Sequence, residues 1–214
     1  MNRREAVRVL GSMGAAGLVA NVLPDQAAAQ DATRYSVLGS GPTVLAFNRA
    51  TSGYFEALAK QYRVVAIDYP PRDPSRSFVD SFTAERVCHD ILTVADETRV
   101  DRFAWFGFSW GAVVGLQLAI RTDRLTALVC GGWPPLGGQY RETLATAEAV
   151  AARGGDKLYV TYYRSLQNWS DREAISKLTC PALCSPEHVM SLWQRAGTFE
   201  SAHWWLSIAR NWSV

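Results

Sequence analysis

The 214-residue sequence has nearly balanced positive and negative charge, and it contains few histidines and cysteines. Its formal net charge is +2, with 22 Lys and Arg interspersed among 20 Asp and Glu, so it lacks the basic surface that binds nucleic acid. It has three histidines and four cysteines, and no spacing of a zinc finger. We therefore expect neither a nucleic-acid partner nor a metal. The 48% hydrophobic content is typical of one globular domain.

The sequence also lacks an apolar run of the roughly 20 residues that a membrane span needs. The nearest approach is at the N-terminus, where Arg3-Arg4 precede a weakly apolar stretch from Val9 to Leu23 and then Ala27 to Ala29. This order is typical of an export signal, and the paired arginines resemble a twin-arginine (Tat) signal. We predict that residues 1–29 direct export and that residues 30–214 function in the periplasm or outside the cell. The alternative is an amphipathic N-terminal helix docked on the domain.

Cysteine content does not define a disulfide framework. An exported protein meets an oxidising compartment, in which a disulfide is permitted. Cys130 and Cys184 lie in apolar strand-like runs, where a free cysteine behaves as a small hydrophobic residue. Cys180 and Cys184 are too far apart on one extended strand to be joined. The sequence therefore leaves disulfide pairing open.

Short apolar runs alternate with helical patterns along the chain. The runs are nearly continuous in apolar residues, as strands buried on both faces should be; they are PTVLAFN (42–48), YRVVAIDY (62–69), RFAWFGF (102–108), LTALVCGG (125–132) and LTCPALC (178–184). Helical spacing is found in residues 53–62, 82–100 and 110–120, with Thr83 as a predicted N-cap. The alternation predicts an α/β fold with a mostly parallel central sheet and helices on both faces.

Residues 133–177 are mostly helical in pattern and rich in aromatic side chains. We expect them to form a short cap over the carboxyl ends of the strands, which is where open α/β sheets bind ligands. Trp133, Tyr140, Tyr162 and Tyr163 are candidates to line an acyl pocket, and the alternative for each is ordinary packing.

The motif G-x-S-x-G occurs at residues 107–111, between a predicted strand and a predicted helix. The turn is expected to be so tight that a Cβ at either Gly107 or Gly111 collides with neighbouring backbone. Such a turn presents the Ser109 hydroxyl above the sheet and aims the helix N-terminus at the group that the serine attacks. We predict that Ser109 is a nucleophile. The alternative is a glycine-rich turn whose serine only caps the helix.

Together with this turn, YFEALAKQYRVVAIDY and RLTALVCGGWPP make residues 33 to about 184 resemble the α/β-hydrolase superfamily. The resemblance implies that Ser109 attacks an ester, lactone or related acyl bond of a small-molecule substrate, with no cofactor. It also implies that the Trp110 N–H is half of an oxyanion hole, the donor pair that stabilises a tetrahedral alkoxide. Cofactor-free perhydrolysis, which other members carry out, is not distinguished by the motif.

The second oxyanion donor normally follows the strand at 42–48, where relatives carry His-Gly. This sequence has Asn48-Arg49 followed by Ala50, and we predict the backbone N–H of Ala50 as the donor. Arg49 leaves two interpretations open: a cation that favours an anionic group of the substrate, or a solvated surface arginine.

The general base must be one of three histidines. His89 is predicted on the solvent face of its helix and precedes the nucleophile, whereas His188 and His203 follow it. The superfamily order of serine, acid and histidine favours His203 as the base. Glu187 is then the candidate acid by elimination. The alternatives are a packed or exposed histidine and a surface glutamate.

The region between Glu187 and His203 contains no clear strand, and the tail is rich in tryptophan. We therefore expect a shortened or rearranged C-terminus in which the last strand of the fold is missing. This expectation keeps a second hypothesis open, a non-catalytic or degraded α/β-hydrolase-like protein with an incomplete triad.

Overall fold

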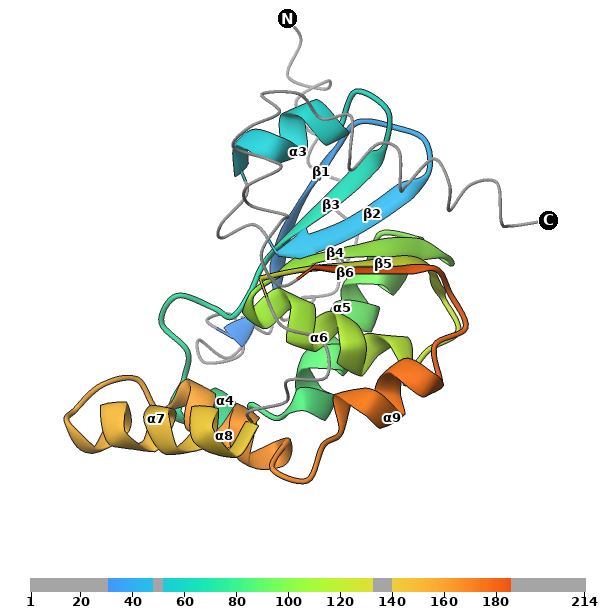
Figure 1. Ribbon diagram of the computed structural model, residues 1–214. Coiled ribbons are helices and arrows are strands. Elements are labelled where there is room, and N and C mark those ends of the chain that lie inside the picture. The colour runs from blue at the N-terminus through green and yellow to red at the C-terminus, as the bar shows by residue number, and fades with distance from the viewer. Residues whose placement is uncertain (1–30, 48–51, 133–139, 186–214) are drawn as a thin grey trace, which may run out of the picture.

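The centre of the protein is a six-stranded sheet. The computed structural model describes residues 31–47, 52–132 and 140–185, and the strand order is β1-β3-β2-β4-β5-β6 (Figure 1). The strands are β1 (Arg34–Leu38), β2 (Thr43–Phe47), β3 (Arg63–Asp68), β4 (Phe103–Phe108), β5 (Leu125–Gly131) and β6 (Ala182–Ser185). Only β1 runs antiparallel to its neighbour among these strands. The predicted mostly parallel sheet is therefore confirmed, and β1 is an edge strand that the apolar pattern did not predict.

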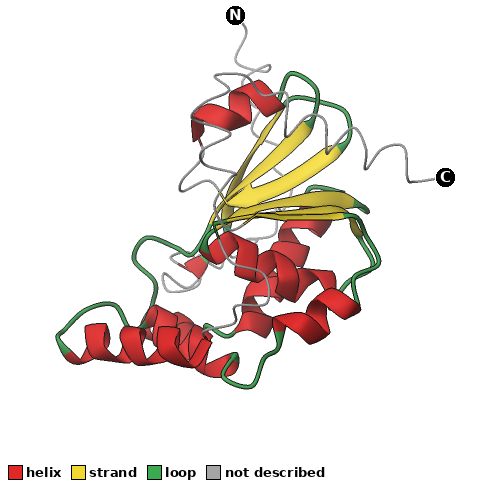
Figure 2. Cartoon of the chain, viewed as in Figure 1, coloured by secondary structure: helices red, strands yellow, loops and turns green. Residues whose placement is uncertain are grey.

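Helices cover both faces of the sheet (Figure 2). They are α3 (Ser52–Leu58), α4 (Arg76–Asp80), α5 (Ala84–Glu97), α6 (Trp110–Ala119), α7 (Tyr140–Ala152), α8 (Leu158–Ser165) and α9 (Asp171–Ser176). Helix α3 lies on one face, and α5, α6 and α9 lie on the other. Helices α7 and α8 pack against each other and project to the side on which the loop after β3 runs toward α4 (Figure 1). The predicted arrangement of helices on both faces is confirmed.

Successive residues of the central strands enter two different cores. In β2, Leu45 packs in the core shared with α5 and α6, whereas Val44 and Ala46 pack in the core beneath α3. In β4, Trp105 packs in the core shared with α5 and α6, and Ala104 packs in the core beneath α3. Because side chains alternate between the faces of a strand, covering both faces requires every residue to be apolar. This requirement explains the continuous apolar runs.

Helix α5 begins as the sequence predicts. The Thr83 hydroxyl accepts a hydrogen bond from the Arg86 N–H at 3.2 Å and so caps the helix. Val87, Ile91 and Val94 on its apolar stripe are all buried against the sheet. The stripe therefore fixes which face of α5 packs inward.

Several earlier predictions concern residues outside the described ranges. The predicted export signal, residues 1–29, is among them, as is the segment from residue 186 onward, where the last strand was expected to be missing. In the described part, no helix is long and apolar enough to cross a membrane.

The core contains titratable groups that burial keeps protonated. Burial raises the pKa of the Cys88 thiol to about 12, against an ordinary 9.0, and the pKa of Tyr163 to about 12, against 10.0. Above pH 9 the unfolded chain releases these protons while the folded chain retains them, so folding stability is complete below pH 9 and declines as the pH rises toward 12. We expect these two groups to lower the free energy of unfolding by about 4 kcal/mol between pH 8 and 11.

Urea unfolding at a series of pH values measures this decline. The Cys88→Ala variant serves as the control, because it removes the thiol and is expected to show a shallower fall between pH 9 and 10, where Tyr163 contributes little. An unfolding free energy that stays constant from pH 8 to 11 contradicts the prediction.

Candidate active site

Ser109 lies at the sharp turn between β4 and α6. Its backbone has φ 52° and ψ −115°, a left-handed conformation that residues with a Cβ seldom adopt. The Ser109 N–H donates to the Gly131 carbonyl on β5 at 2.7 Å, and the Ser109 carbonyl accepts the N–H of Ala112 at 3.0 Å. A strained backbone that neighbouring elements hold in place is typical of functional sites. The strand, turn and helix that the motif predicts are all present.

The turn is tight at Gly107. A Cβ added there would lie 2.1 Å from the carbonyl oxygen of Gly111 and 2.7 Å from the indole nitrogen of Trp105. The same indole N–H donates to the Gly111 carbonyl at 2.9 Å, and Trp105 is fully buried. Trp105 therefore ties the first turn of α6 to β4 directly beneath the serine.

The second glycine of the motif is under a weaker constraint than the sequence suggested. A Cβ at Gly111 would have Phe47 Cδ2, at 3.4 Å, as its nearest neighbour. This distance is an ordinary van der Waals contact with a side chain, so the prediction of a backbone collision is right for Gly107 and wrong for Gly111.

The Ser109 side chain is exposed and does not cap α6. Ser109 occupies the N-cap position of α6, but its hydroxyl makes no capping hydrogen bond to the helix, so the alternative in which the serine hydroxyl only caps the helix is wrong. Ser109 instead lines a cavity of about 310 Å³. The described residues that form its wall are Phe47, Tyr69, Pro70, Phe106, Gly107, Phe108, Ser109, Trp110, Gly111 and Tyr159. The Ser109 hydroxyl at the N-terminus of α6 is thus accessible to a small molecule.

The first turn of α6 supplies hydrogen-bond donors beside this hydroxyl. The amides at the start of an α-helix have no acceptor within the helix, and the helix dipole places partial positive charge there. Trp110 is the first residue of α6 and lines the cavity. This position fits the predicted role of the Trp110 N–H as an oxyanion donor, which remains a prediction.

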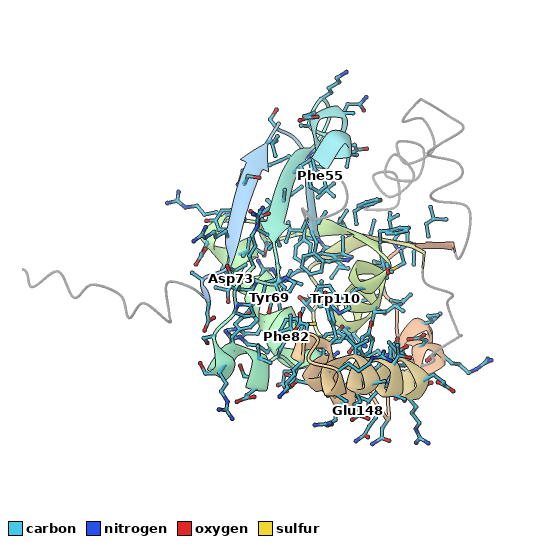
Figure 3. All side chains as sticks on the ribbon, turned by 90° about the vertical axis from the view of Figure 1, so that its left-hand side faces the viewer. Phe55, Tyr69, Asp73, Phe82, Trp110 and Glu148 are labelled. Atoms are coloured by element: carbon cyan, nitrogen blue, oxygen red, sulfur yellow. The ribbon has the colours of Figure 1, made fainter. Side chains whose placement is uncertain are left out.

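Aromatic rings dominate the cavity wall. The ring of Phe47 stacks on Trp110 with centroids 5.0 Å apart and on Tyr69 at 5.8 Å. Tyr159 from α8 meets Trp110 edge-on, at 5.8 Å and 82°. Figure 3 shows Tyr69 and Trp110 close together near the centre of the molecule, with Phe82 beside them. The aromatic residues that line the cavity therefore include a nearly parallel set, Phe47, Tyr69 and Trp110, and the perpendicular ring of Tyr159.

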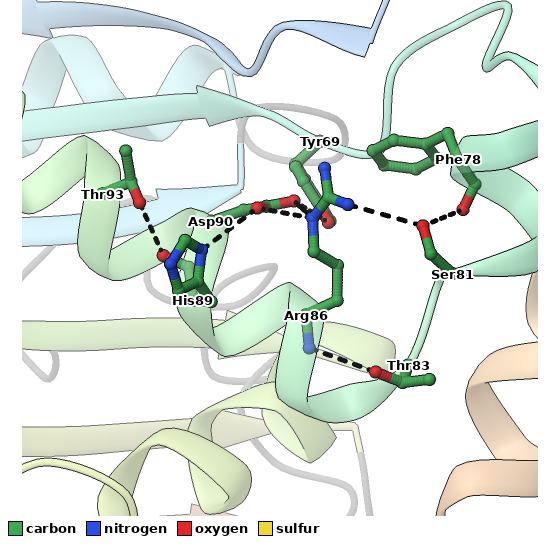
Figure 4. Close-up of polar contacts among 8 residues, drawn as sticks. All are labelled: Tyr69, Phe78, Ser81, Thr83, Arg86, His89, Asp90 and Thr93. Atoms are coloured by element: carbon green, nitrogen blue, oxygen red, sulfur yellow. Dashed lines mark hydrogen bonds and ion pairs between the residues drawn. The ribbon is translucent and has the colours of Figure 1, made fainter.

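Tyr69 is held by a charged network behind the cavity (Figure 4). Its hydroxyl donates to Asp90 Oδ2 at 2.8 Å, and Arg86 Nε donates to both oxygens of the same carboxylate at 2.8 and 2.9 Å. Asp90 is only 9% exposed. Burial, reinforced by the Asp90 carboxylate, raises the pKa of Tyr69 far above its ordinary value. Tyr69 therefore stays neutral, with its ring packed among Phe47, Phe82 and Trp110.

Three of the four aromatic candidates in the cap segment follow the alternative of ordinary packing. Tyr140, Tyr162 and Tyr163 are buried, at 2%, 0% and 7% exposure, and none is among the described residues that line the cavity. Tyr162 instead packs against Trp110, with ring centroids 5.3 Å apart. The segment contributes Tyr159, which the sequence analysis did not single out. Trp133 lies outside the described residues.

The remaining predicted site residues are not described by the structure. Ala50, Glu187 and His203 lie outside the described ranges, as do Arg49 and His188. Their roles as oxyanion donor, acid and base stay predictions.

His89 is 77% exposed on α5, with Nδ1 3.7 Å from Asp90 Oδ1. This exposure confirms that it faces solvent.

In the described ranges, no group of three or more His, Cys, Asp or Glu side chains is placed to hold a metal ion. Cys88 is a free, buried thiol.

A mostly parallel sheet with a strand–serine–helix turn that lines a cavity defines the class: an α/β protein with the G-x-S-x-G turn between a strand and a helix. A profile of the alpha/beta hydrolase family matches residues 37–213. The chain belongs to this family.

Curated relatives match part of the chain. The protein named Putative carbamate hydrolase RutD, from Enterobacter cloacae subsp. cloacae, is 30% identical over 108 residues, which cover 49% of this chain and 40% of that protein. The match therefore spans less than half the length of this relative.

Solved structures share the fold. An esterase from Exiguobacterium antarcticum superposes with a TM-score of 0.55 at 15% identity, over 71% of this chain and 75% of that one. The E219G mutant of the N-acyl homoserine lactonase AidH superposes with a TM-score of 0.52 at 15% identity, over 71% of this chain and 77% of that one. At these identities the likeness concerns the fold alone.

Proposed function

We propose that this protein is an exported serine hydrolase that cleaves a small ester, lactone or related acyl bond. The observation that carries the proposal is the exposed Ser109 hydroxyl, held by a strained turn in a cavity at the N-terminus of α6. Membership of the alpha/beta hydrolase family supports it. The similar proteins include an esterase, a lactonase and a carbamate hydrolase, and these names all concern cleavage of an acyl bond.

In this proposal Ser109 Oγ attacks the carbonyl carbon of the substrate while His203 accepts the hydroxyl proton. Glu187 orients the imidazole, and the N–H groups of Trp110 and Ala50 stabilise the oxyanion of the tetrahedral intermediate. The intermediate collapses to an acyl-enzyme as His203 protonates the leaving group. Water, deprotonated by the same histidine, then attacks the acyl-enzyme and regenerates Ser109. No cofactor is required for these steps.

Labelling with a fluorophosphonate probe tests the proposal. The probe phosphonylates an activated serine, so we expect the folded protein to be labelled, the Ser109→Ala variant to be unlabelled, and the His203→Ala variant to be labelled at least about 100-fold more slowly. Ser36→Ala, which changes an exposed serine on β1, is the matched control. The same probe applied to periplasmic and cytoplasmic fractions of cells tests export.

The outcomes separate the parts of the proposal. Absence of Ser109-dependent labelling in folded protein contradicts the hydrolase and favours a non-catalytic protein of the family. Labelling that His203→Ala leaves unchanged contradicts only the choice of base. A labelled protein confined to the cytoplasm contradicts only export.

A further inference from the structure

The cavity above Ser109 has no charged side chain among the described residues of its wall. The charged pair behind Tyr69 is compensated internally, because Arg86 and Asp90 bind each other through two contacts and Asp90 also accepts the Tyr69 hydroxyl. The partial positive charge at the N-terminus of α6 faces the reacting carbonyl beside Ser109, whereas an anionic group elsewhere in the acyl chain loses its hydration and meets no charged side chain among the described residues of the wall. The electrostatics therefore favour an uncharged ligand.

The arrangement of the rings favours a flat ligand. Phe47, Tyr69 and Trp110 are nearly parallel, with interplanar angles of 14° or less, while Tyr159 stands at 82° to Trp110. Aromatic rings attract one another in offset-stacked and edge-to-face geometries. A planar group in this cavity would lie among aromatic residues in two orientations, the nearly parallel set and the perpendicular Tyr159, with which it can form stacked or edge-to-face contacts. A saturated group of the same size gains less from both contacts.

The cavity has room for an aromatic ring. Its volume of about 310 Å³ is roughly twice that of the roughly 150 Å³ apolar cavity known to take up benzene. A phenyl ring and the adjoining ester group fit this space.

We propose that this cavity binds the acyl group of the substrate and selects an uncharged aromatic acyl group of about the size of phenylacetyl. The inference rests on the proposed function, since it takes Ser109 as the nucleophile, and it adds the class of acyl group. Tyr159 on α8 is then a residue that determines specificity. The aromatic selection depends on its perpendicular ring, and the exclusion of anions depends on the uncharged wall.

Three 4-nitrophenyl esters with one leaving group test the proposal on the full chain. They are the phenylacetate, the cyclohexylacetate and the monoester of succinate, which differ in aromaticity or in charge. We expect kcat/KM for the phenylacetate to exceed that for the cyclohexylacetate by about 2- to 10-fold, the range that aromatic contacts supply. It should exceed that for the succinate monoester by at least about 100-fold, because the carboxylate enters an uncharged wall.

Variants on α8 test the role of Tyr159. Tyr159→Ala is expected to bring the ratio of phenylacetate to cyclohexylacetate close to 1, and Tyr159→Phe is expected to retain it. Arg164→Ala is the matched control, because Arg164 lies on the same helix and forms an exposed ion pair with Glu148 at 2.8 Å; this variant should leave the ratio unchanged. An equal fall for all three esters in Tyr159→Ala overturns the assignment, because packing alone would produce it.

The result separates this inference from the function on which it rests. If none of the three esters is hydrolysed in a Ser109-dependent manner, the proposed function fails. If hydrolysis depends on Ser109 but the succinate monoester is turned over as well as the phenylacetate, only the selection of an uncharged aromatic group is overturned. Loss of that succinate activity in Arg49→Ala would then assign anion binding to Arg49.

Discussion

Replacing Ser109 by alanine is expected to lower kcat for the hydrolysis of 4-nitrophenyl esters by at least about 10⁴-fold, because the attacking oxygen is removed. The same change should alter the free energy of unfolding by no more than about 0.5 kcal/mol, since an exposed side chain without a capping bond is lost. Steady-state kinetics and thermal unfolding of the variant measure the two effects separately. A large loss of rate in an equally stable protein is the signature of a nucleophile.

The Ser36→Ala variant provides the comparison, because it removes an exposed hydroxyl from the edge strand β1. It should keep both rate and stability. Retention of more than about a tenth of the wild-type rate in Ser109→Ala would show that hydrolysis proceeds through another group.

Replacing Gly107 by alanine is expected to destabilise the protein by about 2 to 4 kcal/mol. The added methyl group would lie 2.1 Å from the Gly111 carbonyl oxygen and 2.3 Å from its carbon. Both are backbone atoms that a rotamer change cannot move, so either β4 or the start of α6 has to shift. For a chain of this length we expect the melting temperature to fall by roughly 5 to 15 °C. The fluorophosphonate reaction should be lost with it, because the shift moves Ser109 relative to the amides of α6.

Gly111→Ala is the matched control, since it adds the same methyl group to the other glycine of the motif. Its nearest contact would be Phe47 Cδ2 at 3.4 Å, so the melting temperature should change by no more than a few degrees. An equal loss of stability in the two variants would contradict the geometry described for the turn.

Much of the fold could be predicted from the sequence because each buried strand corresponds to a run of apolar residues. Residues such as Leu45 and Ala46 point into different cores, and no polar residue fits either position. The edge strand β1 escaped this reasoning because Tyr35 and Val37 remain exposed, at 36% and 44%. A strand with most of its side chains in solvent lacks the apolar periodicity from which a strand is predicted.

Only the part of the candidate site that is formed by consecutive residues could be predicted. The turn at Ser109 follows from five consecutive residues, whereas the cavity depends on how distant elements pack. Tyr159, Tyr162 and Tyr163 share one stripe of α8, and the sequence does not reveal which of them meets the cavity, because the docking angle of the helix decides it. The bond from the Tyr69 hydroxyl to Asp90, 21 residues away, and the bond from Trp105 to Gly111 are likewise consequences of packing.

The positive φ of residue 109 also restricts which alcohol this turn can present. Threonine carries a hydroxyl of comparable chemistry, yet its branched Cβ makes such a backbone conformation a genuine outlier. A secondary alcohol is therefore disfavoured here by the path of the main chain rather than by its reactivity. The backbone conformation at residue 109 therefore favours a side chain without a branched Cβ, whether or not a substrate is bound.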